Sequence, residues 1–129
     1  MLLLTLWRCA TTGWVCDSKK GGEEITFQIP LETHKEGYDV RIGFLRSYAG
    51  MGKFEVIGDD NAISADKKGA PKAAIVDGLW SKKISIYQEE SVFKTTGNCT
   101  LTVRTRDQME GATGNKVKLI AVVVYREHL

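Results

Sequence analysis

Apolar and polar residues alternate along most of this chain, a pattern typical of β-strands with one face on a core and one face in water. In residues 24–29, Ile25, Phe27 and Ile29 fall on one face and polar residues fall on the other. The same alternation recurs in residues 38–44, 53–56, 83–87 and 99–105. Such runs favour antiparallel sheets, in which one face stays solvated.

The final run, residues 116–125, begins with alternation and then becomes apolar on both faces. Its three consecutive valines at 122–124 favour a strand over a helix, because β-branched side chains are restricted in helices. We therefore expect a central strand that is covered on both sides.

Turn-forming residues separate these runs, at positions 21–22, 50–52, 58–61, 77–78 and 111–115 among others. No stretch of ten or more residues carries a convincing helical stripe, and the best candidate, residues 62–74, is interrupted by Gly69 and Pro71. Eight or nine short strands separated by turns predict an all-β fold, an antiparallel two-sheet β-sandwich with jelly-roll topology.

An immunoglobulin-like sandwich is the alternative topology. Trp80 falls between Cys16 and Cys99, as that fold often requires. Because Trp80 lies too close in sequence to Cys99 for the usual arrangement, we prefer the jelly roll.

The length of 129 residues predicts one domain over 1–129, with residues 1–12 as an extra first strand or a fragment edge. The net charge of +2, from 18 basic and 16 acidic residues, gives no basic footprint for nucleic acid. The sequence contains no run of 18 apolar residues, so it predicts no membrane-spanning helix. Asn98 begins an N-glycosylation sequon, which slightly favours a secreted or lumenal protein.

The metal-ligating residues are few. Three cysteines, Cys9, Cys16 and Cys99, argue against a complete disulfide framework, so we expect buried thiols, although Cys16 and Cys99 would pair if their strands were neighbours. Asp59 and Asp60 could offer oxygens to calcium, but the EF-hand spacing is absent and a turn is the better interpretation. We predict no cofactor.

Catalytic constellations are weak in the sequence. His34 lies in a polar turn and His128 is the penultimate residue, so neither is placed beside an evident nucleophile. The acidic pairs at 23–24, 59–60 and 89–90 fall at strand ends or turns, where solvated carboxylates are normal. The sequence therefore predicts a protein that is not an enzyme.

The most distinctive segment is residues 43–52, which run from a strong strand into a two-glycine turn. Arg46, Ser47 and Tyr48 offer a fork of donors, a hydroxyl and an aromatic face, which suit a sugar, and Trp80 follows a separate Asp-Gly turn. We predict a non-catalytic carbohydrate-binding or accessory module with these four candidate residues. The alternative is a structural or protein-interaction domain, in which Arg46 and Tyr48 satisfy internal contacts and Trp80 closes one end.

Three segments of the chain resemble the β-sandwich accessory domain that follows the catalytic domain in some eukaryotic GDSL-like (SGNH) esterases and related surface-polysaccharide proteins. They are residues 43–52, 76–80 and 116–122. The resemblance covers about residues 13–129. It implies a jelly roll similar to galactose-binding domains, without catalytic residues of its own, whose partner is a glycan or a neighbouring esterase-type domain. The esterase's own serine motif and its Asp-x-x-His partner do not occur in this chain.

Overall fold

The computed structural model describes residues 7–10, 13–59, 62–64 and 73–127. These residues form ten strands and no helix. The strands are β1 (Arg8–Ala10), β2 (Gly13–Asp17), β3 (Glu24–Ile29), β4 (Tyr38–Arg46), β5 (Lys53–Gly58), β6 (Ile63–Ser64), β7 (Ala73–Asp77), β8 (Ile86–Thr95), β9 (Cys99–Thr105) and β10 (Lys116–Arg126). Within these ranges there is no helix that could cross a membrane.

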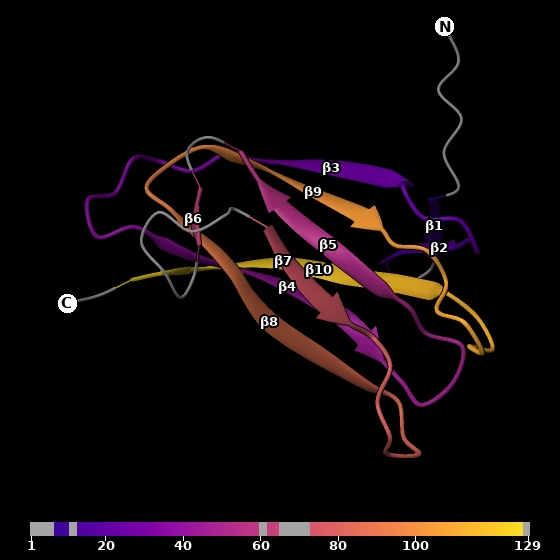
Figure 1. Ribbon diagram of the computed structural model, residues 1–129. Coiled ribbons are helices and arrows are strands. Elements are labelled where there is room, and N and C mark those ends of the chain that lie inside the picture. Colours follow the sequence, from indigo (N-terminus) through magenta and orange to yellow (C-terminus); the bar gives the residue numbers. More distant parts are fainter. Residues whose placement is uncertain (1–6, 11–12, 60–61, 65–72, 128–129) are drawn as a thin grey trace, which may run out of the picture.

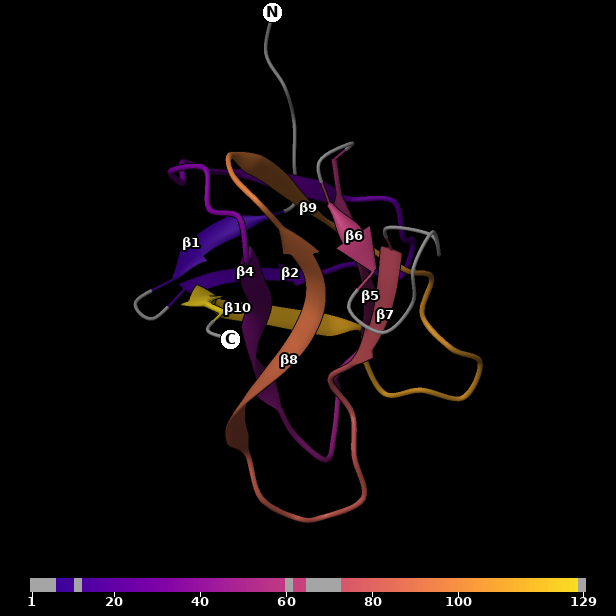
Figure 2. The same ribbon diagram turned by 90° about the vertical axis from the view of Figure 1, so that its left-hand side faces the viewer.

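The strands form two sheets that face each other (Figure 1). The larger sheet has the order β1-β2-β10-β4-β8-β6, and the smaller has the order β3-β9-β5-β7. Every pair of neighbouring strands is antiparallel. Figure 2 views the sandwich from a side, with β8 crossing in front of β4 and β10. The predicted all-β antiparallel sandwich is confirmed.

The core lies between the inner faces of the two sheets. Phe44 of β4 meets Phe54 of β5 edge to face, with ring centroids 5.5 Å apart and an angle of 78°. Leu101 and Val103 of β9 and Ile42 of β4 are also fully buried there. Alternate residues of each strand supply these side chains, as the period-two pattern predicts.

The last strand departs from its prediction. β10 is central in the larger sheet, and its Val122 and Val124 pack against the core. Val123 and Tyr125 lie opposite Arg41 and Asp39 of β4 and point away from the core. Because the described strands make only two layers, the prediction that β10 is covered on both faces is wrong. The apolar residues of its outer face are partly solvated instead.

The strand predicted over residues 83–87 begins only at Ile86 and continues to Thr95 as β8. The sequence did not predict its second half. A register shift opposite Val40 and Arg41 interrupts the alternation there, so the consecutive residues Val92 and Phe93 are both buried. β7 overlaps the end of the segment considered as a helix candidate.

The cysteines of this structure form no disulfide. Cys16 of β2 and Cys99 of β9 are buried thiols in different sheets, so they do not make the pair that the sequence left open. Cys9 is exposed, and its predicted burial is wrong. Burial, together with the charges of Glu23 and Asp17, raises the pKa of Cys16 to about 11.

Candidate functional site

Two chain segments that carry predicted site residues meet at one end of the sandwich. The backbone N–H of Ser47 donates to the carbonyl of Gly78 at 2.9 Å, and the N–H of Trp80 donates to the carbonyl of Ser47 at 2.9 Å. These bonds make a short parallel bridge between Ser47 and Leu79. The end of β4 and the loop after β7 are therefore held side by side.

The glycine turn after Tyr48 is fixed on both sides. Gly50 has a φ of 73°, which favours glycine, and its carbonyl accepts a hydrogen bond from the N–H of Lys116 at 2.9 Å. The N–H of Gly52 donates back to the carbonyl of Lys116, and the carbonyl of Gly52 accepts from the N–H of Gly78. This turn is a rigid support for the residues that precede it.

The side chains of Arg46 and Trp80 come together above this support. The guanidinium carbon of Arg46 lies 5.2 Å from the centroid of the Trp80 ring, within cation–π range. Lys82 Nζ lies 5.3 Å from the same centroid, and Trp80 Nε1 donates to the carbonyl of Ile84 at 2.9 Å. Arg46 Nε is buried and has no hydrogen-bond partner within the described part of the chain.

The other two predicted residues have different surroundings. Tyr48 is 51% exposed and is available to a ligand. Ser47 is buried, and its hydroxyl bonds with the Ser85 hydroxyl at 2.6 Å, so it supports the site from within. We call Arg46, Trp80 and Lys82, together with Tyr48 two residues after Arg46, the end-loop site.

Sequence reasoning named Arg46, Ser47, Tyr48 and Trp80 but missed Lys82 and Ser85. The two missed residues are brought to the site by the loop between β7 and β8, and no local pattern marks a lysine or a serine as belonging to it. Arg46 and Lys82 give the end-loop site a positive character, which favours neutral or anionic ligands over cations.

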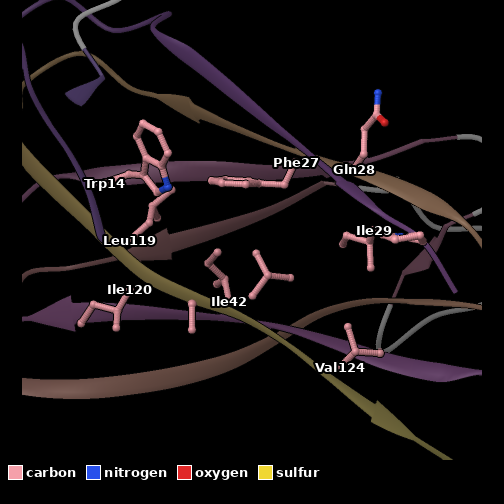
Figure 3. A pocket seen from close by; sticks show the side chains of 11 residues that line it. Trp14, Phe27, Gln28, Ile29, Ile42, Leu119, Ile120 and Val124 are labelled. Carbon is pink, nitrogen blue, oxygen red and sulfur yellow. The ribbon is translucent and has the colours of Figure 1, made fainter. Parts of the chain in front are cut away.

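A separate apolar groove opens between the two sheets, along β3 and β10, and has a volume of about 370 Å³ (Figure 3). Trp14 stands at one end and Val124 at the other. Trp14 and Phe27 meet edge to face at 6.5 Å. The charged residues of the described chain do not line the groove, and Gln28 is its one amide side chain.

Two strand edges border this apolar groove. β2 pairs with β10 only over residues 116–119, so the later residues of β10 have their described strand partner on the β4 side alone. β3 is the edge strand of the smaller sheet. The groove therefore combines apolar side chains with the backbone N–H and C=O groups of two strand edges, which point away from the sheets.

The residues considered for metal binding or catalysis lie elsewhere. Asp59 Oδ2 accepts from the backbone N–H of Thr100 in the neighbouring strand β9 at 2.9 Å, and the Asp59 carbonyl accepts from the N–H of Ala62 in the turn after β5. Asp60 and His128 lie outside the described residues. His34 precedes β4, at the opposite end of that strand from Arg46, and its Nδ1 lies 3.3 Å from Glu36 Oε2. The described part of the chain contains no group of three or more potential metal ligands.

Comparison with known proteins supports the fold. No family model and no curated protein matches the chain. Among solved structures, the chain is similar to TmCBM61, a carbohydrate-binding module in complex with β-1,4-galactotriose. The two share 18% sequence identity and a TM-score of 0.52, over 89% of this chain and 70% of that one. This likeness shows a shared β-sandwich fold, and it gives no support to the predicted relation with esterase accessory domains, which stays a prediction.

Proposed function

We propose that this chain is a non-catalytic module that binds carbohydrate through the end-loop site. The observation that carries the proposal is the placement of the Arg46 guanidinium over the Trp80 ring, with the exposed Tyr48 two residues further along the chain from Arg46. A sugar presents hydroxyls on its rim and an apolar C–H face, and these residues complement both.

Arg46 supplies the directional part of this recognition. Its planar guanidinium can donate parallel hydrogen bonds to neighbouring sugar hydroxyls through its terminal N–H groups, whereas its Nε is buried. The rings of Tyr48 and Trp80 supply apolar surface, while the backbone hydrogen bonds of Ser47, Gly50 and Trp80 keep the ordering cost of binding small.

The fold also favours this function. The similar structure, TmCBM61, holds β-1,4-galactotriose, so neutral β-linked galacto-oligosaccharides are the first probes to use. A module of this kind acts beside a neighbouring enzyme domain, which is the accessory role that the resemblance to esterase-associated domains implies.

Isothermal titration of the purified chain with β-1,4-galactotriose and a panel of neutral oligosaccharides tests the proposal. We expect Arg46→Ala and Trp80→Ala each to weaken binding roughly tenfold or more, because each removes one half of the complementary pair. Trp14→Phe, in the apolar groove, is the matched control and should bind as the wild type does. Absence of binding across the panel, or binding that neither variant weakens, would overturn the proposal.

A second candidate function, protein interaction, is favoured by the apolar groove. An extended apolar peptide from a neighbouring domain fits beside β10 as an added strand, with its side chains against Phe27 and Val124. Ile29→Lys places a charge in the groove. If the groove is the functional surface, this variant should abolish association with the neighbouring domain. If the end-loop site is the functional surface, the variant should leave the affinity for oligosaccharides unchanged.

A further inference from the structure

The outer face of the larger sheet carries a cluster of aromatic and charged side chains. Strand pairing places Glu89 opposite Gly43, Ser91 opposite Arg41, and Tyr125 opposite Asp39. Asp39, Arg41 and Gly43 alternate along β4 with Val40, Ile42 and Phe44, which are buried in the core. The cluster therefore points away from the core. We call Asp39, Arg41, Tyr87, Glu89 and Tyr125 the sheet-face site.

One carboxylate joins the two exposed tyrosines. Glu89 Oε2 accepts from the Tyr87 hydroxyl at 2.8 Å, and Glu89 Oε1 accepts from the Tyr125 hydroxyl at 3.1 Å. Both rings are 46% exposed. Because these hydrogen bonds hold both hydroxyl groups, the two rings keep their positions while much of their surface stays in water.

A second carboxylate fixes the cation of this cluster. Arg41 Nε donates to Asp39 Oδ2 at 2.8 Å, and the Arg41 guanidinium carbon lies 4.6 Å from the centroid of the Tyr125 ring. The other oxygen of Asp39 accepts from the Ser91 hydroxyl. The guanidinium is therefore oriented by an ion pair and a ring together, and its remaining N–H groups can reach a ligand.

The Tyr87 ring lies over Gly43 of β4. A Cβ atom at Gly43 would fall 2.3 Å from the Tyr87 hydroxyl oxygen and 2.6 Å from a ring carbon. Only a residue without a side chain leaves room for a ring there. Gly43 lies within a central strand and does not have a positive φ, so neither a turn nor backbone strain requires glycine at this position. The hydroxyl end of the Tyr87 ring therefore covers Gly43, while 46% of the residue stays exposed to solvent.

The charge state of the cluster selects among ligands. Partial desolvation and the hydrogen bond to Glu89 raise the pKa of Tyr87 to about 12, and the hydrogen bond to Glu89 raises the pKa of Tyr125. Both phenols are therefore neutral donors near neutral pH. The carboxylates of Asp39 and Glu89 exceed the single charge of Arg41, so the site is net negative and repels anionic sugars.

We propose that the sheet-face site binds a neutral pyranose, which stacks its apolar C–H face on the Tyr87 ring. The remaining lone pairs of Glu89 accept from sugar hydroxyls, and the outer N–H groups of Arg41 donate to them. The ligand class rests on the proposed function, but the site is distinct from the end-loop site. It lies on the outer face of β4 and β8, whereas Arg46 and Trp80 lie at their end.

Amide chemical-shift mapping during titration with β-1,4-galactotriose separates the two sites. We expect amide shifts in residues 41–43 and 87–89 of the wild type. Tyr87→Ala should abolish these shifts, and Glu89→Gln should raise the Kd obtained from them roughly tenfold. Gly43→Ala keeps the tyrosine but displaces its ring, and should lose the same shifts. Thr102→Ala, on the smaller sheet, is the control and should leave them unchanged.

Each pattern of shifts decides between the proposals. Shifts around Trp80 alone, unaffected by Tyr87→Ala, would overturn the sheet-face site and leave the proposed function standing. Shifts at the sheet face alone would establish this site and remove the end-loop site from the proposed function. An absence of shifts in the wild type with any neutral sugar would overturn both. If Gly43→Ala fails to fold, Tyr87→Ala carries the test, because its side chain is not part of the core.

Discussion

The two faces of the larger sheet differ in their side chains, although both are formed by the same three strands, β10, β4 and β8. On the inner face, Ile42, Phe44 and Val117 are buried against the smaller sheet. On the outer face, Tyr87 and Tyr125 of the sheet-face site are exposed to solvent, and Tyr87 covers the buried Gly43. Neighbouring residues along β4 thus alternate between packing and polar contacts.

This contrast separates stability from recognition. Apolar burial between the sheets dominates the free energy of folding, because it removes large side chains from water. The exposed tyrosine–Glu89 hydrogen bonds of the outer face contribute little to stability because water competes for them, and the Arg41–Asp39 ion pair is only partly buried. The core is therefore the part of the molecule that determines stability, and the sheet-face site is the part to which we assign the proposed ligand contacts.

The largest expected difference is between two valines of β10. Val117→Asp buries an unpaired carboxylate in the core and should destabilise the domain by several kcal/mol, enough to unfold much of it. Val123→Asp faces outward, opposite Arg41, and should cost about 1 kcal/mol. Thermal unfolding followed by circular dichroism measures both. Equal loss of stability in the two variants would contradict the assignment of the faces.

A smaller contrast compares consecutive residues of β4. Phe44→Ala removes a fully buried ring and should lower the free energy of unfolding by about 3–5 kcal/mol. Leu45→Ala removes a half-buried outer side chain and should cost about 1 kcal/mol. Urea unfolding curves give both values. A larger loss for Leu45→Ala would mean that the outer face packs against a further layer.

The cysteines extend the comparison to chemical reactivity. We expect Cys9 to react with a thiol reagent in the native state, and Cys16 and Cys99 to react only on unfolding. Native Cys16 keeps its proton up to about pH 11, whereas its ordinary pKa is 9.0. Raising the pH between these values therefore favours the unfolded state, which loses that proton first. Reaction of all three thiols in denaturant is the control.

The smallest effect concerns the ionisation of the outer-face tyrosines. Glu89→Gln removes a negative charge beside both hydroxyls, so the pKa of Tyr87 should fall from about 12 toward its ordinary value. Ultraviolet absorbance of tyrosinate during an alkaline titration measures the change. Tyr87→Phe, as a control, should remove the latest transition from the wild-type curve. A titration curve unchanged in Glu89→Gln would show that the carboxylate does not contact these rings.

Local alternation in the sequence was enough to predict the all-β class and the strands β3, β4, β5, β9 and β10. Alternation of side chains is a property of each strand alone, because successive Cβ atoms point to opposite faces whatever the neighbours are. The same reasoning failed for the second half of β8, where the register shift places two consecutive apolar residues in the core. It also failed for the outer face of β10, since coverage depends on which elements lie above a sheet.

The candidate residues divide in the same way. Arg46, Tyr48 and Trp80 could be selected from the sequence because their chemistry and their glycine-rich surroundings are local. That Arg46 lies over Trp80 was decided only by the bridge between Ser47 and Leu79, which joins segments far apart in the chain. Glu89 was noted only as part of the acidic pair at 89–90, and nothing in the sequence connects it with Tyr125. They meet because β10 and β8 flank β4 in one register, and the order of strands in a sheet depends on packing of the whole chain.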